Sequence, residues 1–156
     1  MKHTRLLYYL SVCFLLFAFC GCSDPGAVID NNTALPNKVW AYNNRIGYSF
    51  KIDDPNARYN FYINLRVTGD YKYSNMFVLI PDPVKKNSAR YELKLARPDG
   101  QWLGKGSGNL YSFRIPFKLN YKFPAAGAYN IRIEQNMRDN PLHEVSDVGL
   151  RVEKAH

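Results

Sequence analysis

Cys20 and Cys22, spaced as C-x-C, are the residues near the amino terminus whose types could do chemistry. Such a pair could bind a metal ion, form a redox couple or accept a covalent lipid. The only other cysteine of the chain is Cys13, a few residues upstream. The segments on either side of the pair therefore decide which chemistry applies.

The segment before the pair has the composition of a secretory signal. Lys2 and Arg5 precede an apolar run, Leu6–Phe19, that only Ser11 interrupts. A basic n-region followed by a short apolar h-region is typical of a signal peptide. The run has 14 residues, whereas a helix needs roughly 20 to cross a bilayer. We therefore expect residues 1–21 to be a cleaved signal peptide.

The end of this signal resembles a bacterial lipobox, in which small residues precede a cysteine that becomes the lipidated amino terminus. Cys22 follows Cys20 and Gly21, whereas Cys20 directly follows the bulky Phe19. Cys22 is therefore the predicted lipidation site. Cleavage before it leaves a single thiol, too few for a metal site or an internal disulfide. Because each buried methylene contributes about 0.8 kcal/mol, two or three acyl chains would hold the protein on a membrane. We expect a lipid-anchored protein of the cell envelope, at the outer membrane.

The chain after Cys22 divides by composition. Residues 22–37 hold prolines, a glycine, asparagines and aspartates with little apolar pattern, which is typical of a flexible tether. Residues 38–156 are enough for one domain with its own core. We therefore predict a tether over 22–37 and a single folded domain over 38–156.

Apolar residues in that domain recur at every second position, as in half-buried strands. The clearest stretches are Tyr59–Val67, Tyr91–Leu95, Tyr129–Ile133 and Val148–Val152. Turn formers separate them, and Pro116 marks an edge strand or a strand end because proline cannot donate to a ladder. The predicted fold is all-β, a single antiparallel β-sandwich of about eight strands, immunoglobulin-like or jelly-roll-like.

The charge of the mature chain is basic but dispersed. Removing Lys2 and Arg5 from the 21 basic residues leaves 19 against 13 acidic residues, a formal charge of +6. Such an excess favours anionic partners, although a solvated basic surface is the simpler interpretation. The nearest basic run, Lys85-Lys86, has no stacking aromatics beside it. Nucleic acid is therefore not an expected partner.

No catalytic or cofactor signature stands out. Cleavage would leave only His143 and His156 as histidines, and the G-x-S-x-G signature is absent. The glycines of Gly104–Gly108 lack the spacing of a phosphate loop and indicate a tight or bulged connection. Carboxylates such as Asp53-Asp54 and Asp139 would support glycoside hydrolysis only if the fold paired them. We therefore expect no catalytic residues, no metal and no cofactor.

Five stretches of the domain carry a family resemblance. They are Tyr59–Arg66, Tyr71–Asn75, Leu95–Gly106, Ile133–Arg138 with Pro141-Leu142, and Asp147–Lys154. Taken in order, they resemble the GldH family of gliding-motility lipoproteins from the Bacteroidetes. The resemblance implies an envelope lipoprotein that assists a gliding machinery associated with type IX secretion. It brings no catalytic residues with it.

The leading hypothesis is a non-enzymatic accessory that is held on the membrane by its lipid and binds other envelope proteins. Its contact surface is predicted in the loops around 102–105 and 134–142. The predicted contact residues are Trp102, Lys105, Glu134 and Arg138.

Two alternatives stay open. A lipid-anchored glycan-binding β-sandwich module would need Trp40, Trp102 or several tyrosines exposed on one face, because sugars stack on aromatic rings. A hydrolase would need two carboxylates facing each other in a cleft.

Overall fold

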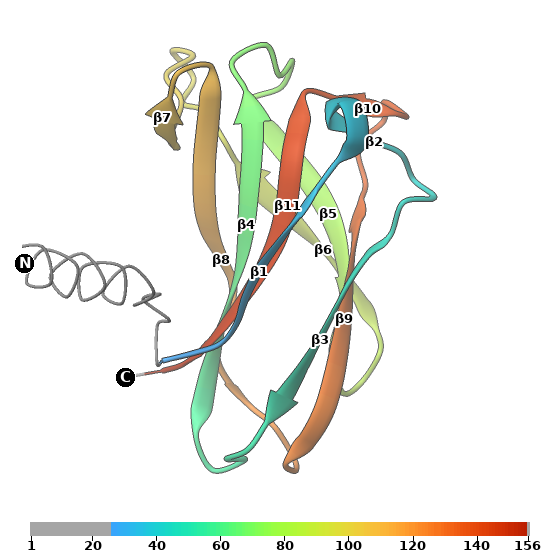
Figure 1. Ribbon diagram of the computed structural model, residues 1–156, viewed down its shortest axis with the longest axis vertical. Helices are drawn as coiled ribbons and strands as arrows, with labels where there is room; N and C mark the ends of the chain where they lie inside the picture. The colour runs from blue at the N-terminus through green and yellow to red at the C-terminus, as the bar shows by residue number, and fades with distance from the viewer. Residues whose placement is uncertain (1–25, 156) are drawn as a thin grey trace, which may run out of the picture.

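The structure, a computed structural model, describes residues 26–155 and is an antiparallel β-sandwich (Figure 1). One sheet has five strands in the order β1 (Ala27–Ala34), β11 (Val145–Lys154), β4 (Arg58–Thr68), β8 (Leu110–Lys122) and β7 (Lys105–Ser107). The other has four in the order β3 (Ile46–Ile52), β9 (Gly127–Gln135), β5 (Asn75–Pro81) and β6 (Ser88–Lys94). The predicted all-β sandwich is confirmed.

The number of strands is higher than the alternation alone suggests. β2 (Val39–Trp40) and β10 (Leu142–His143) form a separate two-stranded pair, and a 3-10 turn, η2 (Pro36–Lys38), precedes β2. These strands, like β7, are two or three residues long. A period of two cannot be recognised over so few positions, since it needs about four residues or more.

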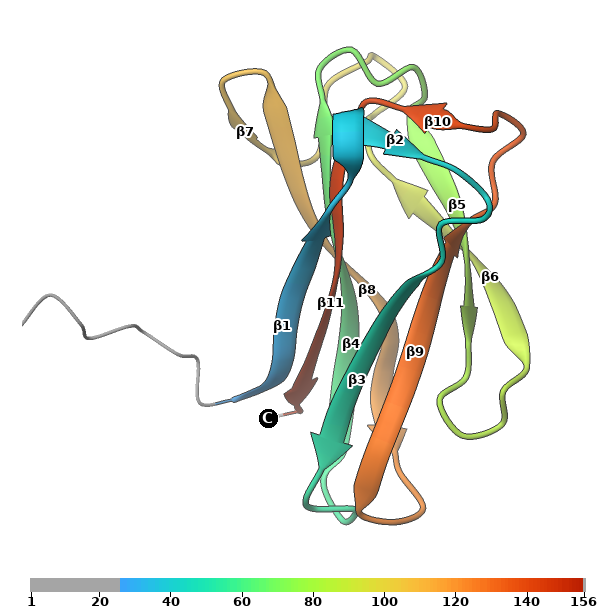
Figure 2. The same ribbon diagram turned by 45° about the vertical axis from the view of Figure 1, so that its right-hand side comes forward.

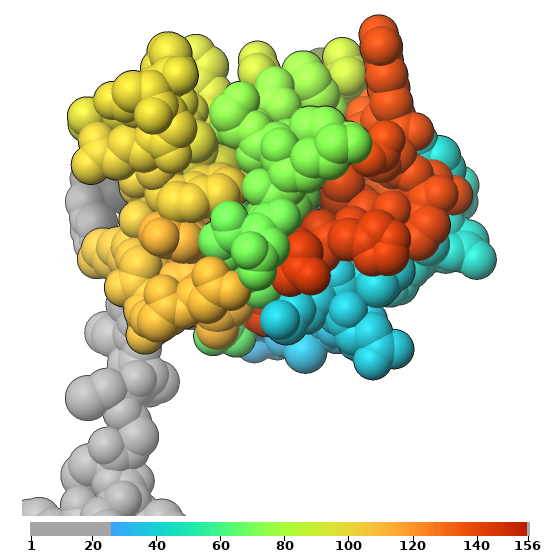
Figure 3. All heavy atoms as spheres, turned by 90° about the horizontal axis from the view of Figure 1, so that it is seen from above, coloured from blue at the N-terminus to red at the C-terminus, as the bar shows by residue number. Residues whose placement is uncertain are grey.

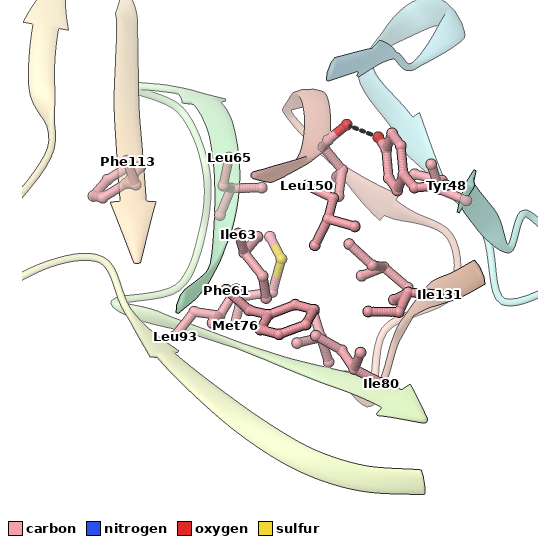
Figure 4. Packing of buried hydrophobic residues seen from close by; sticks show 14 of the residues in the cluster. Tyr48, Phe61, Ile63, Leu65, Met76, Ile80, Leu93, Phe113, Ile131 and Leu150 are labelled. Atoms are coloured by element: carbon pink, nitrogen blue, oxygen red, sulfur yellow. Dashed lines mark hydrogen bonds between the residues drawn. The ribbon is translucent and has the colours of Figure 1, made fainter. Parts of the chain in front are cut away.

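Alternating side chains build the core between the two sheets. In β3, every second residue from Ile46 to Ile52 is buried. Ile63 of β4 and Met76 of β5 meet from opposite sheets in the interior (Figure 4). The hydroxyl of buried Tyr48 donates to the carbonyl oxygen of Val148 at 2.5 Å. That hydrogen bond lets the ring be buried with its oxygen satisfied.

The predicted tether is wrong for half of its length, because Ala27–Ala34 form the edge strand β1. This strand pairs with β11 from Ala27 opposite Glu153 to Ala34 opposite Asp147. Only Ile29 is buried along it, so the sequence has no alternating pattern to read. Backbone hydrogen bonds to β11 hold the strand instead. Cys22 and the signal peptide lie outside the described residues.

Pro116 and the glycines near β7 have the structural roles predicted for them. Beyond Ser112, β8 has β4 on one side and no strand on the other among the described residues. Pro116 therefore lies on an open edge, where no ladder bond is lost. A Cβ added to Gly104 would lie 2.7 Å from the Cζ atom of Phe113, and Gly108 has a φ of 59° in the β7–β8 turn. A side chain fits neither position without strain.

The two ends of the sandwich differ in what fills them. At one end, which we call the aromatic end, aromatic rings at the tips of β3, β4, β8 and β9 fill the space between the sheets. β1 begins at this end. The rings are Phe50, Tyr59, Phe61, Tyr121, Phe123 and Tyr129. The other, here the loop end, carries the β2–β10 pair and the connections around it (Figures 1 and 2).

Candidate functional site

Segments far apart in sequence meet at the loop end. Viewed onto that end, residues near 40, 70, 100 and 140 lie side by side, coloured cyan, green, yellow and red (Figure 3). Two hollows lie towards this end of the molecule. One runs over β4 and β8 and the other lies against β5 and β6.

The first hollow, here the lysine groove, has a volume of about 770 Å³. Its walls come from β4, β8 and the approach to β7, and its basic side chains are Arg66, Lys94, Lys105 and Arg114. The only carboxylate in its lining is Asp147. The groove is therefore positively charged and suits an anionic ligand or an acidic surface.

The four basic side chains of the groove are held in different ways. Arg66 Nε lies 2.6 Å from an Asp147 oxygen, and Arg114 Nη2 lies 3.0 Å from an Asp30 oxygen. Lys94 and Lys105 are exposed and have no ion-pair partner within residues 26–155. These two lysines supply the uncompensated charge of the groove.

Beside the groove, the outer face of the five-stranded sheet carries a satisfied polar network. Asp30 accepts hydrogen bonds from Arg151 at 2.7 Å, Asn64 at 2.7 Å and Arg114 at 3.0 Å. Burial raises the pKa of Asp30, but the hydrogen bonds from Arg151 and Asn64 outweigh it and hold the pKa below its usual value. Arg151 also pairs with Glu153 at 2.5 Å. Unlike the two lysines, these groups already have their partners.

The side chains of Trp102 and Trp40 pack against other residues of the domain. The Trp102 ring stacks on Tyr111 with centroids 5.2 Å apart and meets Phe113 edge-on at 6.5 Å. Trp40 is fully buried, and its Nε1 donates to the carbonyl of Asn44 at 2.8 Å. The prediction that Trp40 could serve a sugar-stacking face is therefore wrong, because a buried indole offers no face to a ligand.

Glu134, a predicted contact residue, lines neither hollow. It lies on β9 with its side chain half-buried, and its Oε1 is 3.2 Å from Arg45 Nε. Lys105 and Arg138 by contrast line the two hollows, one each. The four predicted contact residues are therefore spread over separate surfaces, and their role in contact stays a prediction.

The second hollow, here the tyrosine pocket, has a volume of about 640 Å³. Tyr42 and Tyr73 provide aromatic walls, and both hydroxyls are fixed. The Tyr42 hydroxyl donates to the carbonyl of Met137, and the Tyr73 hydroxyl donates to the Asp139 carboxylate. A hydrogen bond at the hydroxyl restricts the orientation of each ring. Less conformational entropy is then lost when a ligand stacks on the ring.

One arginine of this pocket is oriented by its neighbours. Arg90 lies over the Phe77 ring with its Cζ 3.7 Å from the ring centroid. Its Nε donates to Asn136 Oδ1 at 2.9 Å. A guanidinium has five donors in a fixed fork, so the hydrogen bond at Nε leaves the Nη groups available.

The segment 136–140 that forms the pocket rim is held from beneath by Gln135, which is buried at the end of β9. Its Oε1 accepts from the Met137 N–H at 2.9 Å, and its Nε2 donates to the Asp139 carbonyl at 3.2 Å. The Asp139 side chain is also held. The hydrogen bond from Tyr73, aided by Lys72 at 3.6 Å, keeps the pKa of that carboxyl below its usual value.

The sequence indicated only part of this pocket. The polar stretch 134–142 was singled out and does form its rim, but Tyr42, Tyr73 and Arg90 come from three other segments. Each of them reads alone as an ordinary strand or loop residue. Tyr42, Tyr73 and Arg90 lie beside the 136–139 stretch only because of the way the chain folds. No pattern in the local sequence could therefore have identified them as parts of one pocket.

Within residues 26–155, no group of three or more His, Cys, Asp and Glu side chains is placed to hold a metal ion. In the same residues, no helix has the length and hydropathy of a membrane span.

The fold and the two hollows define a class of protein: an antiparallel β-sandwich with a basic groove and an aromatic pocket on its surface. Comparison with known proteins narrows this class. The family described as "GldH lipoprotein" matches residues 27–152. The chain therefore belongs to the GldH lipoprotein family, which makes it a lipid-anchored protein of the cell envelope.

Two relatives match over nearly their whole length. A protein of Christiangramia forsetii named "Gliding motility lipoprotein GldH homolog" is 32% identical over 152 residues, which covers 91% of this chain and 92% of the relative. The "Gliding motility lipoprotein GldH" of Flavobacterium johnsoniae is 25% identical over 164 residues, covering 99% and 98%. The resemblance found in the sequence is confirmed.

Proposed function

We propose that this protein is a non-enzymatic accessory of a gliding-motility machinery associated with type IX secretion, acting through contacts with other envelope proteins. The names of its two relatives support the link to gliding. The observation that carries the contact role is the lysine groove. Its lysines Lys94 and Lys105 have no partner within residues 26–155, so they favour a partner with an acidic surface.

The anchor supports this role by limiting where the domain can reach. If Cys22 carries the lipid at the outer membrane, five residue steps separate it from Ala27, where β1 begins. A fully extended chain covers at most about 3.6 Å per residue, or about 18 Å in all. A connection of this length keeps the domain close to the bilayer. Its partners are then other proteins at the same membrane.

The same geometry favours the loop end for contact. β1 begins at the aromatic end, so the connection to Cys22 would join the domain at that end. Lys94 and Lys105 lie towards the opposite end, at the end of β6 and the start of β7. The groove is therefore turned away from the attachment point and stays accessible to a neighbouring protein.

The test is affinity purification of the tagged full chain from crosslinked native membranes. We expect envelope proteins of the gliding and secretion assembly to be enriched, and the charge reversal Lys94→Glu with Lys105→Glu to remove them. Lys85→Glu with Lys86→Glu is the matched control, because these exposed lysines lie in the β5–β6 connection at the other end. Cys22→Ala removes the predicted anchor and should also abolish the enrichment.

Two results would contradict the proposal. If no envelope protein is recovered with the unchanged chain, the accessory role is wrong. If the Lys94 and Lys105 reversal retains every partner as well as the Lys85 and Lys86 control does, the groove is not the contact surface. Circular dichroism and thermal melting of each variant establish that the domain is still folded.

A further inference from the structure

The tyrosine pocket combines features that the accessory role does not use. It holds an arginine with a fixed orientation, a second arginine, two tied tyrosine rings and hydrogen-bonding side chains. Binding sites for small ligands have volumes of about 300–1,000 Å³, and this pocket has about 640 Å³. The space therefore suits one or two sugar units or a short peptide end.

Arg90 gives the pocket a directional positive group. Contact with the Phe77 ring fixes the plane of the guanidinium, and the bond from Nε to Asn136 fixes its rotation in that plane. The Nη edge then remains for a ligand. A planar pair of N–H donors matches the two oxygens of a carboxylate, and such charge-assisted pairs are roughly twice as strong as neutral ones.

The net charge of the pocket supports an anionic ligand. Arg138 lines it and has no partner within residues 26–155, whereas the Asp139 carboxylate is occupied by Tyr73 and Lys72. The two arginines therefore exceed the one acidic group. A negatively charged ligand would meet positive charge that the protein has not already neutralised.

The other side chains indicate a sugar rather than a peptide. Tyr42 is 43% exposed, and its ring, like that of Tyr73, offers a face of fixed orientation to the C–H face of a pyranose ring. The Asn136 amide bonds to Arg90 through Oδ1. The Asp139 carboxylate bonds to Tyr73 and Lys72 through Oδ2. Asn136 Nδ2 is therefore left as a donor and Asp139 Oδ1 as an acceptor for hydroxyl groups around a carboxylate-binding arginine. An acidic peptide end would use the arginines but would leave this ring of hydroxyl-binding groups unused.

We propose that the tyrosine pocket binds a uronic acid unit of an acidic polysaccharide. The carboxylate of the sugar pairs with the Nη edge of Arg90, with Arg138 adding charge. The pyranose ring lies against the tyrosine rings, and its hydroxyl groups bond to Asn136 and Asp139. This binding is independent of the lysine groove, which shares no lining residue with the pocket.

The test is calorimetric titration of the full chain, purified in detergent, with three tetramers of matched length. Tetragalacturonate is the acidic sugar, a tetramer of neutral hexoses lacks the carboxylate, and tetraglutamate has carboxylates without sugar rings. We expect tetragalacturonate to bind at least about tenfold more tightly than the neutral tetramer, because a charged hydrogen bond contributes about 1.5–3 kcal/mol. It should also bind more tightly than tetraglutamate, because only the sugar rings can stack on the tyrosines. Its affinity should fall as salt is raised.

Variants link that binding to the pocket. Arg90→Met keeps a flexible chain over Phe77 and removes the fork, so tetragalacturonate affinity should fall about ten- to hundredfold. Arg90→Lys keeps the charge but not the fork and should restore only part of it. Lys85→Met, at an exposed position of the β5–β6 connection that lines neither hollow, is the matched control and should leave affinity unchanged.

Several outcomes would overturn the inference. Absence of tetragalacturonate binding would do so, as would equal binding of the neutral tetramer, since the carboxylate would then play no part. Tighter binding of tetraglutamate would assign the pocket to acidic peptides instead. Loss of affinity in Lys85→Met equal to that in Arg90→Met would mean that binding follows overall charge. Melting curves of each variant separate all of these from unfolding.

Discussion

The two ends of the sandwich are closed by different kinds of interaction. At the aromatic end, Phe123 contacts five other rings with centroids 4.4–6.2 Å apart. At the loop end, the 136–140 segment is held by hydrogen bonds with the side chains of Gln135, Tyr42 and Tyr73. The first arrangement removes apolar surface from water, whereas the second fixes polar groups that stay near the surface.

This difference indicates a division of tasks. Burial of aromatic rings stabilises the whole domain, since the hydrophobic effect scales with the area removed from water. Each hydrogen bond at the loop end adds little net free energy but fixes the position of one side chain. We therefore expect changes at the aromatic end to reduce stability and changes at the loop end to reduce binding.

The largest loss of stability is expected for Phe123→Ala. Phe123 is buried at the centre of the ring cluster, and truncating such a phenylalanine costs about 3–5 kcal/mol. Urea denaturation should show the loss in the free energy of unfolding, while folded molecules still bind tetragalacturonate. A loss below about 1 kcal/mol, the range of ordinary substitutions, would refute the idea that this end carries the stability.

A smaller loss is expected for Asp82→Asn at the same end. Asp82 accepts from Lys118 Nζ at 2.5 Å and from the Tyr121 hydroxyl at 3.0 Å. Its other partners are the backbone N–H groups of Val84 and Lys85, both at 2.9 Å. Hydrogen bonds to a charged group contribute about 1.5–3 kcal/mol. Asp53→Asn, which alters an exposed ion pair with Lys51, is the control and should change little.

The same carboxylate predicts how stability depends on pH. Burial raises the pKa of Asp82, but the hydrogen bond from Lys118 and those from the backbone outweigh it and hold the pKa far below 3.8. Because the folded-state pKa is the lower one, the contribution is complete above the unfolded-state value near 4 and is lost as the pH falls through the folded-state value. The acid slope of the unfolding free energy should be shallower in Asp82→Asn, and an identical slope would contradict the assignment.

At the loop end, Gln135→Ala tests whether hydrogen bonds hold the pocket rim. The change leaves the Met137 N–H and the Asp139 carbonyl without their partner, which costs about 1–3 kcal/mol. Hydrogen exchange should speed up in 136–140 and stay unchanged at the aromatic end. Gln101→Ala, at an exposed turn, is the control. Uniform acceleration over the whole domain would mean that the two ends are not independent.

The sequence predicted the sandwich because alternating burial is a local property. In β4 the apolar residues at every second position from Tyr59 to Val67 are all buried, as their spacing indicated. β1 was missed because its single buried residue, Ile29, leaves no period to detect. An edge strand held by backbone bonds leaves almost no trace in side-chain pattern.

The candidate site was less predictable because its parts come from separate segments. Lys105 and Arg138 were selected from polar loops and do line the two hollows. Arg90 was not selected, since its importance depends on Phe77 and on Asn136. Asn136 is 46 positions away along the chain. Strand order sets that distance, and strand order cannot be read from local patterns.

Tyr73→Phe should have the smallest effect on stability and the clearest effect on the pocket. Tyr73 is half-buried, so the free energy of unfolding should change by no more than about 0.5–1.5 kcal/mol when its one hydrogen bond is removed. The pKa of Asp139, which this bond lowers most, should rise towards its usual value in a carboxyl-carbon NMR titration. Tetragalacturonate affinity should fall by up to about tenfold, because the hydrogen bond to Asp139 is what fixes the Tyr73 ring in the pocket.

Phe123→Ala should lower the free energy of unfolding and leave the affinity unchanged, whereas Tyr73→Phe should lower the affinity with little loss of stability. If Tyr73→Phe instead lowers stability as much as Phe123→Ala does, the hydrogen bonds of the loop end belong to the core, and the division of tasks between the two ends fails.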